Sequence, residues 1–379
     1  MTEVHQFLPT LAANDAIGMH VLRLRRLLRD AGFASEVFAE DIHDEMRGEA
    51  LPYRGYRTYV RSATDAWLLY HSSTGSPMAE FLVDQDLPLL IDYHNITDAR
   101  YFERWAPVIA QRMRDARDQL HRIAPKARFA LADSSFNRSE LDEAGCPRTA
   151  VAPILIDFDD YRAEPHPRTL ARLRRQRSRG GARWLFVGRM APNKCQHDVI
   201  AAFATYRKVF DPKARLTLVG GMTARSYWRS LEGLATELEL GRDALTLANL
   251  VPFPALLAHY RTADVFVCLS EHEGFNVPVL EAMHFGVPVV AYAATATPET
   301  VGDAGLLLAD KDPLVLATAV DRVIQDRDLR ATLCDAGRRR VEHFSLANSG
   351  RRTIDAITSF LADSRDGGAD SGTAGVAGG

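Results

Sequence analysis

Short apolar segments, each followed by a segment of helical periodicity, most constrain what this chain can fold into. The segments with the length of buried strands are residues 66–70, 88–93, 129–132, 184–187, 216–219, 264–269 and 288–291. Strands covered on both faces of a parallel sheet are continuously apolar in this way. Helical periodicity is clearest at residues 18–29, 101–123, 197–209 and 278–285. The alternation predicts an α/β protein with doubly wound parallel sheets.

Chain length and one basic segment predict the domain organisation. A chain of 379 residues is too long for one core, which indicates two domains. The alternation breaks at YRAEPHPRTLARLRRQRSRGG, whose arginines fit either acidic lipid headgroups or a solvated helix. We predict a Rossmann-like N-terminal domain at 1–165, a basic linker at 166–181 and a Rossmann-like C-terminal domain at 182–345. A C-terminal helix at 346–362 and a disordered tail at 363–379 should follow, because the tail lacks large apolar side chains.

Composition and charge exclude several classes of protein. The net charge of −3 argues against a dedicated nucleic-acid binder, which would be clearly basic. The four cysteines form no C-x-x-C pair, which fits unpaired thiols in a reducing compartment. The opening residues, MTEVHQFLPT, do not read as a signal peptide, and no stretch approaches the roughly 18 apolar residues of a membrane span. We therefore expect a cytoplasmic protein, at most peripheral at the inner face of the plasma membrane.

The motif SEHEGFNVPVLEAM follows one predicted strand at its carboxyl end, where open α/β sheets bind ligands. Asn276 is expected to cap the next helix, with Pro278 in its first turn. The free amides before that helix can hold an anion. Glu273 and Glu281 then offer two carboxylates that can accept hydrogen bonds from vicinal hydroxyls. The alternative is that these are ordinary exposed acids near a helix start.

A second motif, VGRMAPNK, follows another predicted strand and opens a helix. Its cations, Arg189 and Lys194, can converge on one diphosphate. Taken alone, Arg189 also fits an ordinary surface loop. Because each motif directly follows the carboxyl end of a strand in the same predicted sheet, we expect both motifs to face one crevice.

Together the two motifs resemble glycosyltransferase family 4, the retaining transferases with the GT-B fold, and in particular bacterial polysaccharide-biosynthesis members. Glu273 and Glu281 match the family's E-x7-E element, and the resemblance continues through GVPVVAYAATATPETVGDAGLLL. It is weaker in the first half, at DAIGMHVLRLRRLLRDAG, DYHNITDARYF and ADSSFNRSEL. The resemblance implies two Rossmann-like domains facing a central cleft.

The resemblance also implies roles for the matched residues of the second motif and its surroundings. Arg189 and Lys194 would neutralise the leaving diphosphate, and His94 would approach the donor sugar from the other domain. Val251, in the segment NLVPF, would meet the nucleotide base through backbone groups. Many members carry a Gly-Gly loop near the diphosphate, but this chain reads LPTLAANDAIG there, which leaves Gly18 as the matching glycine.

For the first motif, the resemblance implies that Glu281 binds the donor ribose and that Glu273 binds the transferred sugar. The loop that accompanies Glu273 in donor binding consists of Gly274, Phe275, Asn276 and Val277.

These features predict a retaining hexosyltransferase that uses a GDP-, UDP- or dTDP-sugar, with GDP-mannose favoured. The acceptor would be a saccharide or lipid-linked saccharide in surface polysaccharide or glycoconjugate synthesis. No cofactor and no metal are expected, since two cations already face the diphosphate and the D-x-D sequences at 84–86 and 157–159 read as surface acids. Three alternatives remain: a nucleotide-sugar epimerase or hydrolase, a non-catalytic nucleotide-sugar-binding scaffold and, less favoured without G-x-G-x-x-G, a nicotinamide oxidoreductase.

Overall fold

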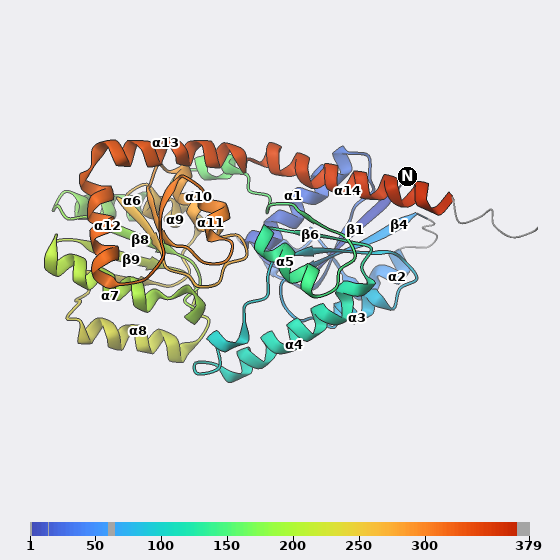
Figure 1. Ribbon diagram of the computed structural model, residues 1–379, viewed down its shortest axis with the longest axis horizontal. Coiled ribbons are helices and arrows are strands. Elements are labelled where there is room, and N and C mark those ends of the chain that lie inside the picture. Colours follow the sequence, from blue (N-terminus) through green and yellow to red (C-terminus); the bar gives the residue numbers. More distant parts are fainter. Residues whose placement is uncertain (1, 14, 60–64, 370–379) are drawn as a thin grey trace, which may run out of the picture.

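The computed structural model describes residues 2–13, 15–59 and 65–369, which form two α/β domains lying side by side (Figure 1). The N-terminal domain has a parallel sheet in the order β3-β2-β1-β4-β5-β6-β7, and the C-terminal domain one in the order β10-β9-β8-β11-β12-β13. The strand order reverses between β1 and β4 in one sheet and between β8 and β11 in the other. Each reversal opens a crevice at the carboxyl ends of the strands. The predicted fold class, two doubly wound domains, is confirmed.

The strands of the N-terminal sheet are β1 Glu3–Leu11, β2 Val37–Ile42, β3 Leu51–Pro52, β4 Ala66–Ser72, β5 Leu89–Tyr93, β6 Phe129–Ala132 and β7 Thr149–Val151. Those of the C-terminal sheet are β8 Arg183–Val187, β9 Arg215–Val219, β10 Leu245–Ala248, β11 Val265–Cys268, β12 Val289–Tyr292 and β13 Gly305–Leu308. All the predicted strands are present. The long strand β1 was missed because His5 and Gln6 interrupt its apolar run, although both side chains are buried.

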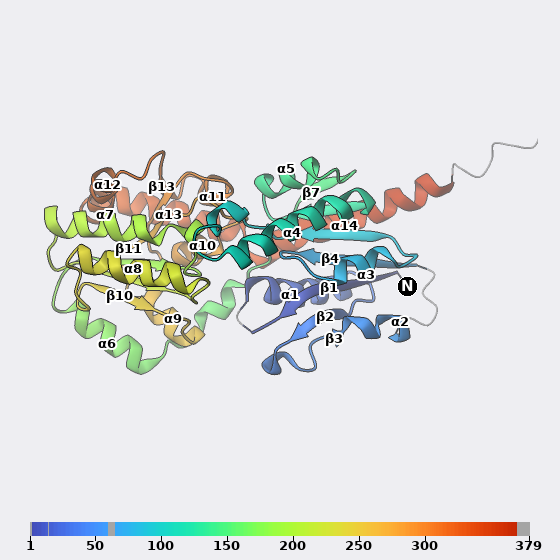
Figure 2. The ribbon, with the colours of Figure 1, turned by 90° about the horizontal axis from the view of Figure 1, so that it is seen from below.

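Helices cover both faces of each sheet (Figures 1 and 2). In the first domain they are α1 Ala16–Asp30, α2 Tyr56–Tyr59, α3 Met78–Val83, α4 Pro107–Ile123 and α5 Ser135–Glu143. From there to the chain end they are α6 Pro167–Arg177, α7 Gln196–Val209, α8 Arg225–Glu237, α9 Phe253–Tyr260, α10 Val277–His284, α11 Thr297–Val301, α12 Pro313–Gln325, α13 Arg327–His343 and α14 Leu346–Ala369. The short 3₁₀ helices are η1 Asp44–Met46, η2 Tyr53–Gly55, η3 Ala99–Tyr101, η4 Ala124–Lys126, η5 Phe158–Arg162 and η6 Pro192–Lys194.

The predicted basic linker at 166–181 is mostly the helix α6, and it belongs to the C-terminal domain. His166 caps this helix by accepting the backbone amide of Thr169. Leu173 is buried, and its carbonyl accepts a hydrogen bond of 3.0 Å from the guanidinium of Arg183 at the start of β8. The segment that joins the domains therefore lies earlier, between β7 and α6.

The C-terminal helix α14 returns to the N-terminal domain. Helices α13 and α14 follow one another along one edge of the molecule and span both domains (Figure 1). Ile357, Phe360 and Leu361 of α14 are buried in the same cluster as Val4 of β1. The helix continues to Ala369, so the prediction that it ends at 362 and that disorder begins at 363 is wrong for these residues. Residues 370–379 of the predicted tail lie outside the described part of the chain.

Candidate functional site

A cavity of about 440 Å³ lies where the two domains and their connection meet. The N-terminal domain lines it with α1, the connection with residues 154–156 and 160–161, and the C-terminal domain with the segments around Val251 and α10. Its lining includes Asp15, Arg23, Tyr161, Val251 and Glu281. Val251 and Glu281 thus occupy the cleft that the resemblance implied.

Glu281 points its carboxylate at two tyrosine hydroxyls. Tyr161, from the connection, donates to Oε1 at 2.6 Å, and Tyr260, from α9, donates to Oε2 at 2.5 Å. Burial raises the pKa of Glu281, and these two hydrogen bonds oppose that rise. Each carboxylate oxygen has a second lone pair, so Glu281 retains the capacity to accept hydrogen bonds from a ligand in the cavity.

Lys194 and Glu273 bring the two sequence motifs together. The loop after β8 carries Lys194 in η6, and the loop after β11 carries Glu273. The Lys194 ammonium lies 2.5 Å from Glu273 Oε2, and both side chains are largely buried. Arg189 is exposed and forms no ion pair among the residues that the structure describes. The two motifs therefore meet as expected, but Lys194 is paired with a carboxylate and Arg189 is the cation left open.

The loop before α10 offers backbone donors, although not through the predicted cap. Asn276 lies in the left-handed region, with φ of 75°, and its side chain turns inward to donate to Thr297 Oγ1 at 3.1 Å. The expected Asn276 side-chain cap is therefore wrong, because the buried hydroxyl of Thr297 takes its amide. In the described chain, the backbone amides of Gly274, Phe275, Asn276 and Val277 have no protein acceptor. These amides and the positive end of α10 can hold an anion.

His94 follows β5 directly, but its side chain does not face the cleft. Its Nδ1 lies 3.0 Å from Asp133 Oδ2, its Nε2 lies 3.0 Å from His71 Nδ1, and only 1% of the side chain is exposed. Burial lowers the pKa of His94, but the carboxylates of Asp133 and Asp92 outweigh it and raise that pKa to about 9. The expectation that the His94 side chain approaches the donor sugar is therefore not met, because both ring nitrogens are engaged inside the domain.

Gly18 also has a packing role. Its amide donates to Asp15 Oδ2 at 2.9 Å, which closes the first turn of α1. A Cβ on Gly18 would lie 3.0 Å from the carbonyl oxygen of Ala12, so the helix start approaches the end of β1 closely. The cavity is lined by its neighbours Asp15, Ala16 and Met19, and Gly18 is not among the lining residues.

Contacts between the domains involve residues that the sequence analysis did not assign. Ser134 donates to the carbonyl oxygen of Gly274 at 2.7 Å, and His272 Nε2 lies 2.7 Å from Asn95 Oδ1. A Cβ on Gly274 would lie 2.6 Å from the Cβ of Asn95, so only glycine permits this approach. His272 and Asn95 lie inside the quoted motifs SEHEGF and HNIT, which was the available signal. The loop before α10 is thus held against the N-terminal domain.

A family comparison classifies the C-terminal domain. Residues 174–340 match the model described as "Glycosyl transferases group 1". Residues 174–340 are a glycosyl transferases group 1 domain. This group 1 domain contains Arg189, Lys194, Glu273 and Glu281, and so it contains both motifs from which the resemblance began.

Curated relatives of the group 1 domain are named as glycosyltransferases. The chain is 34% identical over 245 residues to D-inositol 3-phosphate glycosyltransferase of Geodermatophilus obscurus, a match that spans 62% of this chain and 52% of the relative. It is 28% identical over 314 residues to O-antigen chain mannosyltransferase B of Escherichia coli, covering 82% and 77%. It is 30% identical over 260 residues to GDP-mannose-dependent alpha-(1-6)-phosphatidylinositol monomannoside mannosyltransferase of Mycolicibacterium smegmatis, covering 66% of each chain. The chain thus spans only about half the length of the first of these relatives.

Solved structures extend the likeness to both domains. The crystal structure of Anabaena Alr3699/HepE in complex with UDP and glucose superposes with a TM-score of 0.73 at 19% identity, covering 94% of this chain and 100% of that one. The fold is GT-B, as the resemblance implied. Among the described residues, no helix has both the length and the apolar character needed to cross a bilayer.

Proposed function

We propose that the protein is a retaining hexosyltransferase that takes its sugar from a nucleoside diphosphate. The observation that carries this proposal is the inter-domain cavity with Glu281 in its wall, beside the amides of residues 274–277, which have no acceptor in the described parts of the chain. A carboxylate held by two tyrosines suits the vicinal hydroxyls of a ribose. The amides and the helix start suit the diphosphate.

In the proposed mechanism, cleavage of the glycosidic bond builds negative charge on the leaving diphosphate. Arg189 is exposed and has no ion-pair partner among the described residues, so it can bind a phosphate without losing one. Lys194 and Glu273 remain an ion pair where the loops after β8 and β11 meet. In this position Lys194 would face the phosphate and Glu273 would face the sugar hydroxyls. Removing one preorganised donor from a developing anion typically lowers turnover by about 10²–10³. Arg189 and Lys194, rather than a divalent metal, would supply the positive charge that stabilises the leaving diphosphate.

We further propose GDP-mannose as the donor and a saccharide or lipid-linked saccharide as the acceptor. Two of the relatives are named mannosyltransferases, one of them GDP-mannose-dependent and named for a phosphatidylinositol mannoside. The structural neighbour in complex with UDP makes a UDP-sugar the alternative. If the sugar is transferred to a lipid-linked acceptor, the protein would act in the cytoplasm, in peripheral contact with the membrane.

Nucleotide-dependent stabilisation tests the donor site. Tm would be measured with GDP, UDP, dTDP and their sugars, for the natural chain, for Glu281→Gln and for Glu271→Gln. Glu271 is a matched control, because it lies two residues from Glu273 but pairs with Lys311 outside the cavity. A ligand at about 100 times its dissociation constant adds about 2.7 kcal/mol, or several degrees.

The proposal predicts a base-selective rise in Tm that Glu271→Gln keeps and Glu281→Gln loses. Sugar release without an acceptor would instead identify a hydrolase, and binding without turnover towards any acceptor would identify a scaffold. If no nucleotide raises Tm, the assignment of the cavity is wrong.

A further inference from the structure

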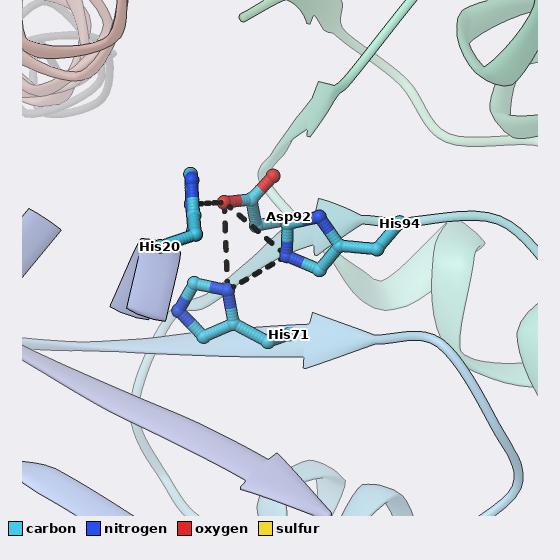
Figure 3. A group of neighbouring side chains, drawn as sticks. All are labelled: His20, His71, Asp92 and His94. Carbon is cyan, nitrogen blue, oxygen red and sulfur yellow. Dashed lines mark hydrogen bonds and ion pairs between the residues drawn. The ribbon is translucent and has the colours of Figure 1, made fainter. Parts of the chain in front are cut away.

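A buried cluster of imidazole and carboxyl groups lies in the N-terminal domain, near the carboxyl ends of β4 and β5 (Figure 3). His71 comes from the end of β4, and Asp92 and His94 come from the end of the neighbouring strand β5. Their side chains are at most 1% exposed. His20 of α1 joins the cluster from the side. Because β4 and β5 are central strands, these groups are held on a rigid frame.

Three donor atoms of this cluster form a triangle with the dimensions of a zinc site. His71 Nδ1 lies 3.0 Å from His94 Nε2 and 3.5 Å from Asp92 Oδ2, and His94 Nε2 lies 3.8 Å from the same oxygen. Zinc binds nitrogen and oxygen tetrahedrally at about 2.0–2.2 Å, which places neighbouring ligand atoms about 3.3–3.6 Å apart. The observed edges bracket this range.

The ring nitrogens of His71 and His94 that point away from the triangle, here called the outer nitrogens, form hydrogen bonds. These bonds orient the two imidazoles as the rings of metal-binding histidines are oriented. His71 Nε2 lies 3.0 Å from Gln6 Oε1, and His94 Nδ1 lies 3.0 Å from Asp133 Oδ2. Each outer nitrogen therefore carries a hydrogen. Without a metal, the two inner nitrogens share one proton in the 3.0 Å hydrogen bond between them, and when that proton leaves, both inner lone pairs face the same position. Metal ligands typically have such a carboxylate or carbonyl partner on the far nitrogen.

His20 supports the triangle without being part of it. The backbone amide of Leu155 donates to His20 Nδ1 at 2.9 Å, so a neutral His20 carries its hydrogen on Nε2. That Nε2 donates to Asp92 Oδ2 at 2.8 Å. His20 is thus an outer partner of the Asp92 carboxylate.

The charge of the cluster calls for a cation. Within the described residues, the ion-pair partners of Asp92 and Asp133 are histidines, without Lys or Arg. Asp92 Oδ1 is buried and has no hydrogen-bond partner there. A buried carboxylate oxygen without a hydrogen bond is costly, and one proton shared by His71 and His94 leaves two carboxylates facing one positive charge. A divalent ion balances both.

We propose that His71 Nδ1, His94 Nε2 and the Asp92 carboxylate bind a zinc ion. Imidazole nitrogens with a carboxylate oxygen in tetrahedral spacing are a donor set that suits zinc. The ion has a structural role: it ties β4 to β5 and fixes the backbone of His94 and Asn95, against which Gly274 packs. This site is separate from the donor diphosphate, for which no metal was expected.

Metal binding by the purified full-length chain tests the proposal. The chain is stripped with a chelator, incubated with zinc chloride, desalted and analysed for zinc, and Tm is measured with and without the metal. We expect one zinc ion per chain and a Tm several degrees higher. Cobalt in place of zinc should give the intense visible absorption of a tetrahedral site.

Variants assign the ion to this cluster. Asp92→Asn keeps the side-chain volume and should abolish zinc retention. His259→Gln, at a buried histidine of the C-terminal domain, should retain it, as should His197→Gln, which removes one of a second group of potential ligands. The proposal is overturned if the natural chain retains no zinc, in which case a proton occupies the position, or if Asp92→Asn retains zinc. Should Asp92→Asn fail to fold, the absence of a tetrahedral cobalt spectrum in the natural chain would still overturn it.

Discussion

Glu281 is the residue on which the proposed donor site most depends, and its orientation is set by two tyrosines from different parts of the chain. Tyr260 belongs to the same domain as Glu281, whereas Tyr161 belongs to the connection between the domains. The E-x7-E spacing predicted the carboxylate and its place in the cleft. It did not predict the tyrosines, because Tyr260 reaches Glu281 only through the packing of α9 on α10, and Tyr161 only when the connection folds back over α10. The same limit explains His94, whose partners Asp133 and His71 come from other strands.

Tyr161→Phe should weaken nucleotide binding while leaving the cavity walls in place. The change removes one hydrogen bond of 2.6 Å to Glu281 and keeps the ring. Hydrogen bonds to charged groups contribute about 1.5–3 kcal/mol, so a loss of affinity of about tenfold or more is expected. Calorimetric titration with a nucleoside diphosphate measures it. Tyr227→Phe is the control, since its hydroxyl lies 2.9 Å from His197 Nδ1 and outside the cavity; equal affinities for both variants would contradict the prediction.

The raised pKa of Glu281 gives nucleotide affinity a pH dependence. The folded protein holds this proton more tightly than the unfolded chain, so the contribution of the group to stability is largest at acidic pH. That contribution is lost as pH rises through the folded-state pKa, which burial places above the ordinary value. Ribose binding needs the ionised carboxylate, so affinity should rise over the same interval. Titrations across the acidic range should show this rise in the natural chain and a smaller one in Glu281→Gln. Identical profiles would assign the effect to other groups.

At the scale of elements, helix α14 is the least expected feature. The apolar runs predicted seven inner strands, β4, β5, β6, β8, β9, β11 and β12, to within one or two residues, but they missed the inner strands β1 and β2, whose runs contain polar residues. Edge strands such as β3 and β13 were not predicted, since short and partly exposed strands carry a weak pattern. The helix at 346–362 was predicted, but its docking partner was not. That partner is the opposite domain, and only the packed structure brings Phe360 onto Phe129.

Phe360→Ala should destabilise the N-terminal domain. The Phe360 ring is buried and stacks on Phe129, with 4.8 Å between ring centroids. Removing a buried phenylalanine costs about 3–5 kcal/mol. Chemical denaturation followed by the fluorescence of Trp67, whose ring lies 5.6 Å from Phe360, should show a lower midpoint. Ser359→Ala, at an exposed position of the same helix, should leave it unchanged. An unchanged midpoint in Phe360→Ala would mean that α14 does not stabilise this domain.

At the scale of the whole molecule, the closeness of the two domains depends on one glycine. Gly274 meets Asn95 at a distance that leaves no room for a Cβ, and Ser134 bonds its carbonyl oxygen. The sequence predicted two domains and a cleft. It did not predict that the loop expected to bind the donor is also one of the contacts between the domains, because that contact depends on their relative placement.

Gly274→Ala should hold the domains further apart. The added Cβ would lie 2.6 Å from the Cβ of Asn95, so the domains must separate or the loop must shift. A misplacement of about 1 Å in a reacting site can lower turnover about 100-fold. Small-angle scattering should show a larger radius of gyration, and turnover should fall more than donor affinity. Gly233→Ala, in α8 with open space around it, is the control. A natural radius and natural turnover in Gly274→Ala would refute this role for the contact.

The return of α14 also fixes an order of events during protein synthesis. Ile357, Phe360 and Leu361 complete a cluster that begins at Val4, yet the ribosome adds them after all of the C-terminal sheet. Until then, the first domain to emerge exposes an apolar face on β1, β4 and β6. Its nascent form is therefore a natural client for chaperones, and the second domain can finish folding before the first.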